Sequence, residues 1–390
     1  GGTMRYFFCI GILLFSLLFM QVASSFVGAC SICSGFSQSL TFREEAARPQ
    51  AKVIFLAKVA NSTLSKDGKG FSLLSIEKLF RKPMALELGK TVRLAQYIPV
   101  AETGDAFLLI FADVRDGQVE PYRGVSLKGR QAESYLSAMF DASPLDPVLR
   151  LEKVMPFLES PVREVASDAF LEFAKANDET LARVSKIMDA THLRTWILDA
   201  RVPEERLGLY AYLLGGCGGA GDIDFLMGIL RDQGRRSAAA YDGAMIALLR
   251  LQPERTWPVV YGLLENQDTS LQLRLACFRS LKAMLLIAES PTDREKIYKA
   301  YRVAWQQGEL ADLSVEELRR TSKWEWTDEI LVRYGTKGYE APVVKRAILR
   351  YALTAPQTPT LQKFLDQRKQ SEPMVLEEVR ESLGLVPVGK

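Results

Sequence analysis

Residues 161–173 read PVREVASDAFLEF, and their apolar side chains recur at the spacing of an α-helix. The preceding Ser160 supplies a hydroxyl cap, and Pro161 suits the first helical position. The acidic residues Asp168 and Glu172 fall away from the apolar stripe. The stripe consists of Val162, Val165, Ala166, Ala169, Phe170 and Phe173. The sequence therefore predicts an amphipathic helix whose apolar face packs against a neighbour.

The same period continues to the C-terminus. Apolar stripes recur in residues 271–285 and 343–353, and short breaks separate further helical candidates. These candidates are residues 178–189, 203–214, 222–232, 235–251, 253–265, 291–307, 312–320, 324–334, 358–369 and 372–383. The sequence from residue 143 onward is therefore expected to be helical throughout.

Three of these segments, residues 161–166, 271–276 and 342–347, resemble the second helices of HEAT repeats. Each contains an aliphatic residue, a basic residue and a nearby alanine. HEAT units run about 40–47 residues and stack because one helix pair cannot bury its own apolar stripe. The resemblance implies an α-solenoid over residues 143–390. The alternative is an irregular helical domain without regular superhelical curvature.

Upstream of residue 143 the pattern is that of strands. Residues 52–59 form an apolar, β-branched run, and Asp67-Gly68 is typical of a hairpin turn. The expected strands are residues 52–59, 71–80, 91–95, 106–111 and 118–127, and residues 131–140 are expected to form a closing helix. Five strands and a helix in so short a segment predict a small closed barrel, which has no exposed sheet edges.

This strand-rich segment resembles the netrin-like OB-fold module of tissue inhibitors of metalloproteinases. The likeness is carried by Ala29-Cys30-Ser31-Ile32-Cys33 and by the strands at residues 51–59 and 104–111. It implies that a free amine and carbonyl at Cys30 would chelate the zinc of a protease. Two features depart from the family: it has Cys-x-Cys where this chain has Cys-x-x-Cys, and its module holds several disulfides.

The first thirty residues predict export. Arg5 precedes an apolar run over residues 6–20, which is shorter than the roughly 20 residues of a membrane span. Small residues then lead to Ala29 and Cys30, so cleavage is expected between these two. Residues 27–30 also resemble a bacterial lipobox, in which Cys30 would be lipidated. An uncleaved membrane anchor is the remaining alternative.

The predicted fold class is α+β in several domains. Residues 1–29 form the leader, residues 30–142 a five-stranded OB-like β-barrel, and residues 143–390 a HEAT-like α-helical solenoid. The protein is expected to be secreted, periplasmic or anchored in the envelope. A formal net charge of only +3 gives no electrostatic case for nucleic acid as a partner.

The four cysteines after the leader are Cys30, Cys33, Cys217 and Cys277, and four thiols allow three pairings. A structural disulfide between Cys30 and Cys33 is favoured over a redox pair, which would need a helix start inside a βαβ unit. Cys277 is expected to be a buried thiol, and Cys217 a quiet small residue in a turn. A four-cysteine zinc site is not expected, since no second close pair follows.

No catalytic constellation emerges. Residues 216–221 formally match the G-x-G-x-x-G dinucleotide motif, but that motif requires a preceding strand, and residues 207–214 are expected to be helical. The glycines are therefore interpreted as a helix C-cap and turn, with Asp222 capping the next helix. His192, the single histidine, is expected to be structural, and no metal or cofactor is expected.

Trp324-Glu325-Trp326 is a candidate partner groove. Residues two apart on a helix point to nearly opposite sides, so one ring is expected to be exposed. Exposed tryptophan near arginine and tyrosine is typical of interface hot spots. The candidate groove residues are Arg319, Arg320, Trp324, Trp326 and Tyr334. The alternative is that both rings pack at a helix junction.

The function predicted from these observations is that of an exported, non-catalytic binding or scaffold protein of the cell envelope. Its partners would be proteins, and membrane contact would come only through the leader or a lipidated Cys30. One alternative is a metalloproteinase inhibitor acting through Cys30. The other is an enzyme with a site assembled across the two domains.

Overall fold

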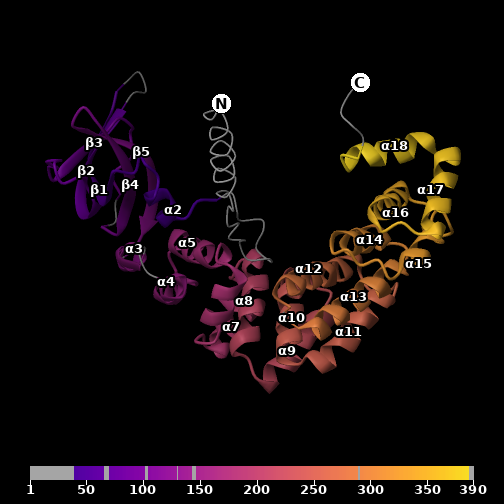
Figure 1. The fold of residues 1–390 in the computed structure, drawn as a ribbon. Coiled ribbons are helices and arrows are strands. Elements are labelled where there is room, and N and C mark those ends of the chain that lie inside the picture. Colours follow the sequence, from indigo (N-terminus) through magenta and orange to yellow (C-terminus); the bar gives the residue numbers. More distant parts are fainter. Residues whose placement is uncertain are drawn as a thin grey trace, which may run out of the picture.

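The computed structural model describes residues 39–65, 70–101, 104–129, 131–142, 146–288 and 290–385. It shows an α+β protein in which an N-terminal five-stranded antiparallel sheet precedes many helices (Figure 1). The predictions about residues 1–29, Ala29, Cys30 and Cys33 lie outside the described residues. They include leader cleavage, lipidation, the Cys30–Cys33 disulfide and zinc chelation by Cys30.

The five strands fall where the sequence places them. They are β1 (Val53–Leu64), β2 (Gly70–Arg81), β3 (Thr91–Leu94), β4 (Ala106–Arg115) and β5 (Gln118–Lys128). Their order in the sheet is β3-β2-β1-β4-β5, and every pairing is antiparallel. The strand predictions are confirmed, although β1 reaches Leu64 rather than residue 59 because its exposed second half still pairs with β2.

The sheet is not closed, whereas the sequence predicted a closed barrel. Its two ends are β3 and β5, and the four residues of β3 pair only with β2. On the other end strand, Pro121 lies within β5 next to a break in the register with β4. Proline cannot donate a backbone hydrogen bond and is accepted on edge strands, so β5 is suited to remain an edge.

Both faces of the sheet are buried, because alternate residues of a strand point to opposite sides. On one face Val53 and Phe55 pack with Leu86 and Val92 in a small core of the sheet itself. On the other face residues such as Ile54 join the large core that continues into the helices. The strand predicted to be apolar on both faces, β4, contributes to both cores, which confirms that prediction.

The helices are α2 (Phe42–Ala46), α3 (Gln131–Ala142), α4 (Pro147–Val154), α5 (Arg163–Ala174), α6 (Asp178–Ser185), α7 (Ala190–Leu198), α8 (Glu204–Cys217), α9 (Ala220–Arg231), α10 (Arg235–Leu251), α11 (Pro253–Glu265), α12 (Leu271–Ile287), α13 (Pro291–Trp305), α14 (Ala311–Arg320), α15 (Thr327–Leu331), α16 (Pro342–Thr354), α17 (Pro359–Ser371) and α18 (Pro373–Ser382). The sequence analysis missed α7, which buries only Leu193 and Ile197.

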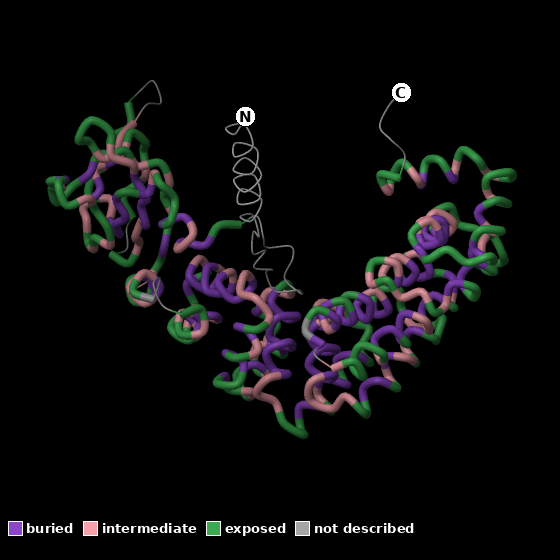
Figure 2. The backbone as a smooth tube through the Cα atoms, viewed as in Figure 1, coloured by how far each residue is buried: buried purple, intermediate pink, exposed green. Residues whose placement is uncertain are grey.

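From α7 onward the helices follow one another along a curved path in two layers (Figure 1). The even-numbered helices α8, α10, α12, α14, α16 and α18 lie on the inner side of the curve, and the odd-numbered helices lie on the outer side. Most helices pack against the next one or two in sequence. Figure 2 shows buried residues gathered between the two layers. None of the helices described is long and apolar enough to cross a membrane.

Glycine brings α8 and α10 into close contact. A Cβ on Gly243 of α10 would lie 1.8 Å from the Gly208 carbonyl oxygen of α8. The predicted turn over residues 216–221 is shorter than expected: Cys217 is the last residue of α8, and only Gly218 and Gly219 separate it from α9. Gly218 is the C-cap of α8, and its N–H donates to the Leu214 carbonyl at 2.7 Å. The Asp222 carboxylate accepts from the N–H of Gly219 at 2.8 Å and so caps α9, as predicted.

The junction between sheet and helices is a buried polar cluster. Asp168 and Glu172, predicted to lie away from the apolar stripe of α5, are each only 3 % exposed. Asp168 accepts from the Phe42 N–H at 2.7 Å and from the Tyr135 hydroxyl at 2.5 Å. Arg43 pairs with Glu172 at 3.0 Å. The polar side of α5 is therefore covered by the short helix α2, which the sequence analysis did not foresee.

Candidate functional site

The structure distributes the predicted groove residues over separate places. Arg319 and Arg320 end α14, Trp324 and Trp326 lie in the turn before α15, and Tyr334 follows α15. Arg319 forms two hydrogen bonds with Glu316 of its own helix, at 2.7 and 3.1 Å. The predicted residues are thus close in sequence, but they contact different neighbours.

Both tryptophans are half-buried at a helix junction. Trp324 makes an edge contact with Tyr351 of α16, with ring centroids 4.9 Å apart. The guanidinium of Arg302 on α13 lies 5.9 Å from the ring centroid of Trp326. Both rings pack against the main core. The geometry favours the alternative interpretation, in which the rings stabilise the junction rather than line an open groove.

Tyr334 belongs to a third group of contacts. Its hydroxyl donates to Glu372 at 3.0 Å, and the charged ends of Lys345 and Arg368 lie 5.0 and 4.9 Å from its ring centroid. Burial raises the pKa of Tyr334, and the neighbouring Glu372 adds to this, so the hydroxyl remains a proton donor. This cluster ties the segment after α15 to α16 and α17.

An open groove with a volume of about 290 Å³ lies between two neighbouring helices of the inner layer, α12 and α14. Its lining residues are Leu275, Phe278, Arg279, Lys282, Leu313, Glu316, Glu317 and Arg320. Helix α13 packs against both α12 and α14 and lies on the outer side of the curve (Figure 1). The groove therefore opens toward the inside. We call these eight residues the inner groove.

Helical spacing explains why apolar residues meet in the inner groove. On α12, Leu271, Leu275, Lys282 and Leu286 recur four or seven positions apart and share one side. The outermost of these, Leu271 and Leu286, are exposed, as is Leu313 across the groove on α14. The apolar stripe therefore continues beyond both ends of the inner groove.

Ion pairs join neighbouring inner helices. Arg279 of α12 pairs with Asp242 of α10 through two bonds of 2.8 and 2.9 Å, and Lys282 lies 3.4 Å from Glu317 of α14. Arg320 reaches Glu317 at 3.3 Å. These pairs link α10, α12 and α14 across the inner side of the curve.

Glu316 is the centre of the next link. Arg350 of α16 donates to it at 3.2 Å, in addition to Arg319. Burial acts to raise the pKa of Glu316, but the hydrogen bonds and charges of the two arginines outweigh burial, and the pKa is lowered. The carboxylate is therefore fully charged near neutral pH and links α14 to α16.

Exposed apolar residues continue along α16 and α18. Val343 and Arg350 lie seven positions apart on one side of α16, and Met374 and Glu378 lie four apart on α18. Arg346 of α16 pairs with Glu378 at 3.1 Å. Val343 and Met374 are both exposed. The inner side thus carries apolar side chains interspersed with paired charges.

The remaining candidates that the structure describes are Cys217, Cys277 and His192. Cys217 is half-buried and Cys277 buried, and both are free thiols. Burial raises the pKa of Cys217 to about 11 and that of Cys277 to about 12. His192 is exposed and stacks on Trp196 with centroids 6.1 Å apart. Within the described residues, no cluster of three or more histidine, cysteine or acidic side chains could hold a metal ion.

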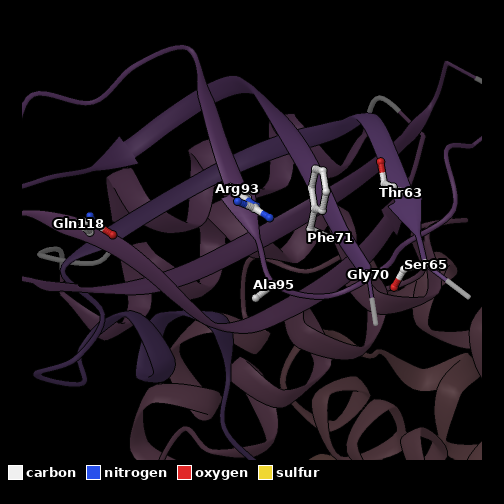
Figure 3. Close-up of a pocket in the computed structure, with 7 residues that line it drawn as sticks. All are labelled: Thr63, Ser65, Gly70, Phe71, Arg93, Ala95 and Gln118. Atoms are coloured by element: carbon white, nitrogen blue, oxygen red, sulfur yellow. The ribbon is translucent and has the colours of Figure 1, made fainter. Parts of the chain in front are cut away.

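A second hollow, of about 500 Å³, lies on the sheet near the end of the β1–β2 hairpin (Figure 3). Its lining includes Phe71, Arg93 and Gln118. The guanidinium of Arg93 lies 4.2 Å from the ring centroid of Phe71. Arg93 thus covers a ring face on which a ligand could otherwise stack, and Phe71 is the one large apolar side chain among the residues that line the hollow. The inner groove is the stronger candidate.

Comparison with known proteins adds no family: no family model, no curated protein and no solved structure matches the chain. The geometry of the chain itself therefore carries the functional argument.

Proposed function

We propose that the chain is an exported, non-catalytic scaffold protein that binds a protein partner on the inner side of its helical array. The observation that carries this proposal is the presence of exposed apolar side chains on the inner helices α12, α14, α16 and α18. These side chains are Leu271, Leu286, Leu313, Val343 and Met374. Exposed apolar residues rimmed by polar ones are typical of protein interaction sites.

The finer architecture belongs to the same proposal. Packing between near neighbours along a curved path is the arrangement expected of a HEAT-like solenoid, in which each repeat buries the stripe of the next. Such an array offers an extended concave surface. The open sheet, with its own core beneath β1 and β4, is proposed to be an OB-like module that packs at one end of the array.

Site-specific photo-cross-linking in cells of the native host tests the function. The photoreactive residue benzoylphenylalanine replaces Leu313 in the inner groove or Val332, which is exposed at the end of outer helix α15. Irradiation is expected to give a defined cross-linked protein band from position 313 and none from position 332. The proposal is wrong if the two positions give the same bands, or if position 313 gives none.

A further inference from the structure

The acidic side chains of the inner groove are more deeply buried than the basic ones. The side chains of Glu316 and Glu317 are only 17 % and 16 % exposed. The cations above them are far more open: Arg279 and Lys282 are each 55 % exposed and Arg320 is 53 % exposed. Each cation is anchored from below by a carboxylate. The surface that a partner meets is therefore positive, although the cluster as a whole is nearly balanced.

The same ion pairs hold the cationic side chains in defined positions. Arg279 is held by two bonds to Asp242, and Arg320 by both Glu316 and Glu317. Side chains that are already ordered lose little conformational freedom when they bind, which favours specific recognition. Arginine keeps further N–H groups for a second carboxylate, because its guanidinium carries five donors.

The apolar floor lies between these cations. Leu275 and Phe278 of α12 face Leu313 of α14 across the groove. An α-helix with its side chains is about 10–12 Å across, so one helix can lie along such a trough with apolar residues down and acidic residues beside the cations. A flat bilayer would not follow the inner side of a curve, which makes a membrane surface a poor fit.

We infer that the inner groove binds a partner segment that combines acidic side chains with apolar ones, in the manner of an acidic amphipathic helix. This inference rests on the proposed function and adds the chemistry of the partner. The cations Arg279, Lys282 and Arg320 bind carboxylates, and the floor of Leu275, Phe278 and Leu313 takes the apolar side chains.

Peptide selection tests the partner's chemistry. A phage-displayed library of random 16-residue peptides is selected on the full exported chain, and bound peptides are sequenced. The selected peptides are expected to be net acidic and rich in leucine, isoleucine or phenylalanine. Binding of the best synthetic peptide, followed by fluorescence anisotropy, should weaken as salt rises, because the contacting charges are exposed.

Matched variants connect the selection to the site. R279Q/K282Q/R320Q should weaken that peptide by about tenfold or more, since it removes three exposed cations. K363Q changes an exposed lysine on outer helix α17 and should leave binding unchanged. E316Q/E317Q removes the carboxylates beneath the cations and should tighten binding. Circular dichroism melting confirms that each variant is folded.

Several outcomes would overturn the inference. Selected peptides that are neutral or basic, no enrichment above background, or equal binding by the triple variant would each exclude an acidic segment at this site. Co-sedimentation with phosphatidylglycerol vesicles in place of peptide binding would point to a lipid surface, and self-association in analytical ultracentrifugation to a second copy. A cross-link from position 313 to a partner that is not acidic would leave the proposed function standing while this inference fails.

Discussion

The contact of α2 with α5 and the contact of α8 with α10 hold helices together by opposite means. The first buries charged and polar side chains, with Asp168 and Glu172 receiving hydrogen bonds from the α2 segment. The second contact has no side chains at its closest point, because the two backbones meet at Gly208 and Gly243. One interface is specified by hydrogen bonds and the other by shape. They should therefore fail in different ways.

The charged interface explains how so short a helix is held. Five residues are too few for a stable isolated helix. Ordering the first turn costs more conformational entropy than its few hydrogen bonds return in free energy. The capping box of Thr41 and Glu44 starts α2, and Glu45 accepts hydrogen bonds from Tyr122 and Arg123 of β5. Lys175 of α5 pairs with Glu44 at 2.5 Å. Helix α2 is thus clamped between the sheet and the helices.

We expect the largest loss of stability when a single methyl group is added at the glycine interface. In G243A the new Cβ would lie 1.8 Å from the Gly208 carbonyl oxygen and 2.8 Å from the Tyr212 nitrogen, and both are backbone atoms. Neither can move without separating α8 from α10. The free energy of unfolding is expected to fall by about 3 kcal/mol, at the upper end for overpacking. Urea denaturation followed by circular dichroism measures the loss.

Two helical glycines provide controls for this prediction. A Cβ on Gly228 of α9 or Gly262 of α11 would have no neighbour within 4 Å. G228A and G262A should therefore keep or raise stability, by up to about 1 kcal/mol, because alanine is the better helix former. If G243A behaved like them, the close contact of α8 and α10 would be wrong.

The charged interface should respond to the loss of an acceptor. D168A leaves the Phe42 N–H and the Tyr135 hydroxyl buried without their acceptor, at an expected cost of about 2 kcal/mol. D168N keeps an acceptor oxygen and should recover most of this loss. Limited trypsin digestion gives a local readout, since released α2 would be cut after Arg43, whereas Pro49 protects the bond after Arg48. Equal digestion of D168A and the unaltered protein would contradict the clamp.

The sequence revealed the regular elements and missed both interfaces. Alternation and helical spacing are local signals, so the five strands and most helices could be predicted. The burial of Asp168 could not, because its partner Phe42 lies 126 residues away. Glycines at positions 208 and 243, inside two predicted helices, were the available signals for the close helix contact, but whether they meet depends on how α8 and α10 align.

The candidate site was predicted in the same partial way. Arg320 lines the inner groove, and it was named from its nearness to the tryptophans. Lys282 and Glu317 were not named, because their pairing follows from the alignment of α12 with α14. The tryptophans stood out by residue type, but the structure uses them as packing residues at the junction of α13 and α16. Residue type alone therefore drew attention to tryptophans that pack at a junction, and of the residues it named only Arg320 lines the inner groove.

The charged interface should also respond to pH, and the glycine interface should not. Burial raises the pKa of Asp168 to about 7 from a model-peptide value of 3.8, although the hydrogen bonds from Tyr135 and Phe42 act in the opposite direction. Glu172, Arg43, Arg123 and Arg150 are the charged groups around it. Between pH 3.8 and about pH 7, Asp168 is protonated to a greater extent in the folded state than in the unfolded state. The free energy of unfolding therefore falls as pH rises toward 7.

D168N isolates this effect. The difference in unfolding free energy between the unaltered protein and D168N should be most favourable to the unaltered protein near pH 4, and it should shift toward D168N by more than about 1 kcal/mol as pH rises through 7. Acidic groups whose pKa is lowered in the folded state, such as Glu316, destabilise both proteins equally on acidification. Their contribution therefore cancels in the difference. A difference that does not vary with pH would mean that Asp168 does not titrate in this window.

The smallest expected effect on stability is at the inner groove, where ion pairs are exposed rather than buried. K282Q removes the contact with Glu317, and more than half of the lysine side chain is already in solvent. Exposed ion pairs contribute roughly 0.2–1 kcal/mol, so the free energy of unfolding in urea should change by less than about 1 kcal/mol. Binding of an acidic peptide should nevertheless weaken severalfold, because the lysine faces the partner. A large loss of stability would instead make this pair part of the scaffold, like the clamp around α2.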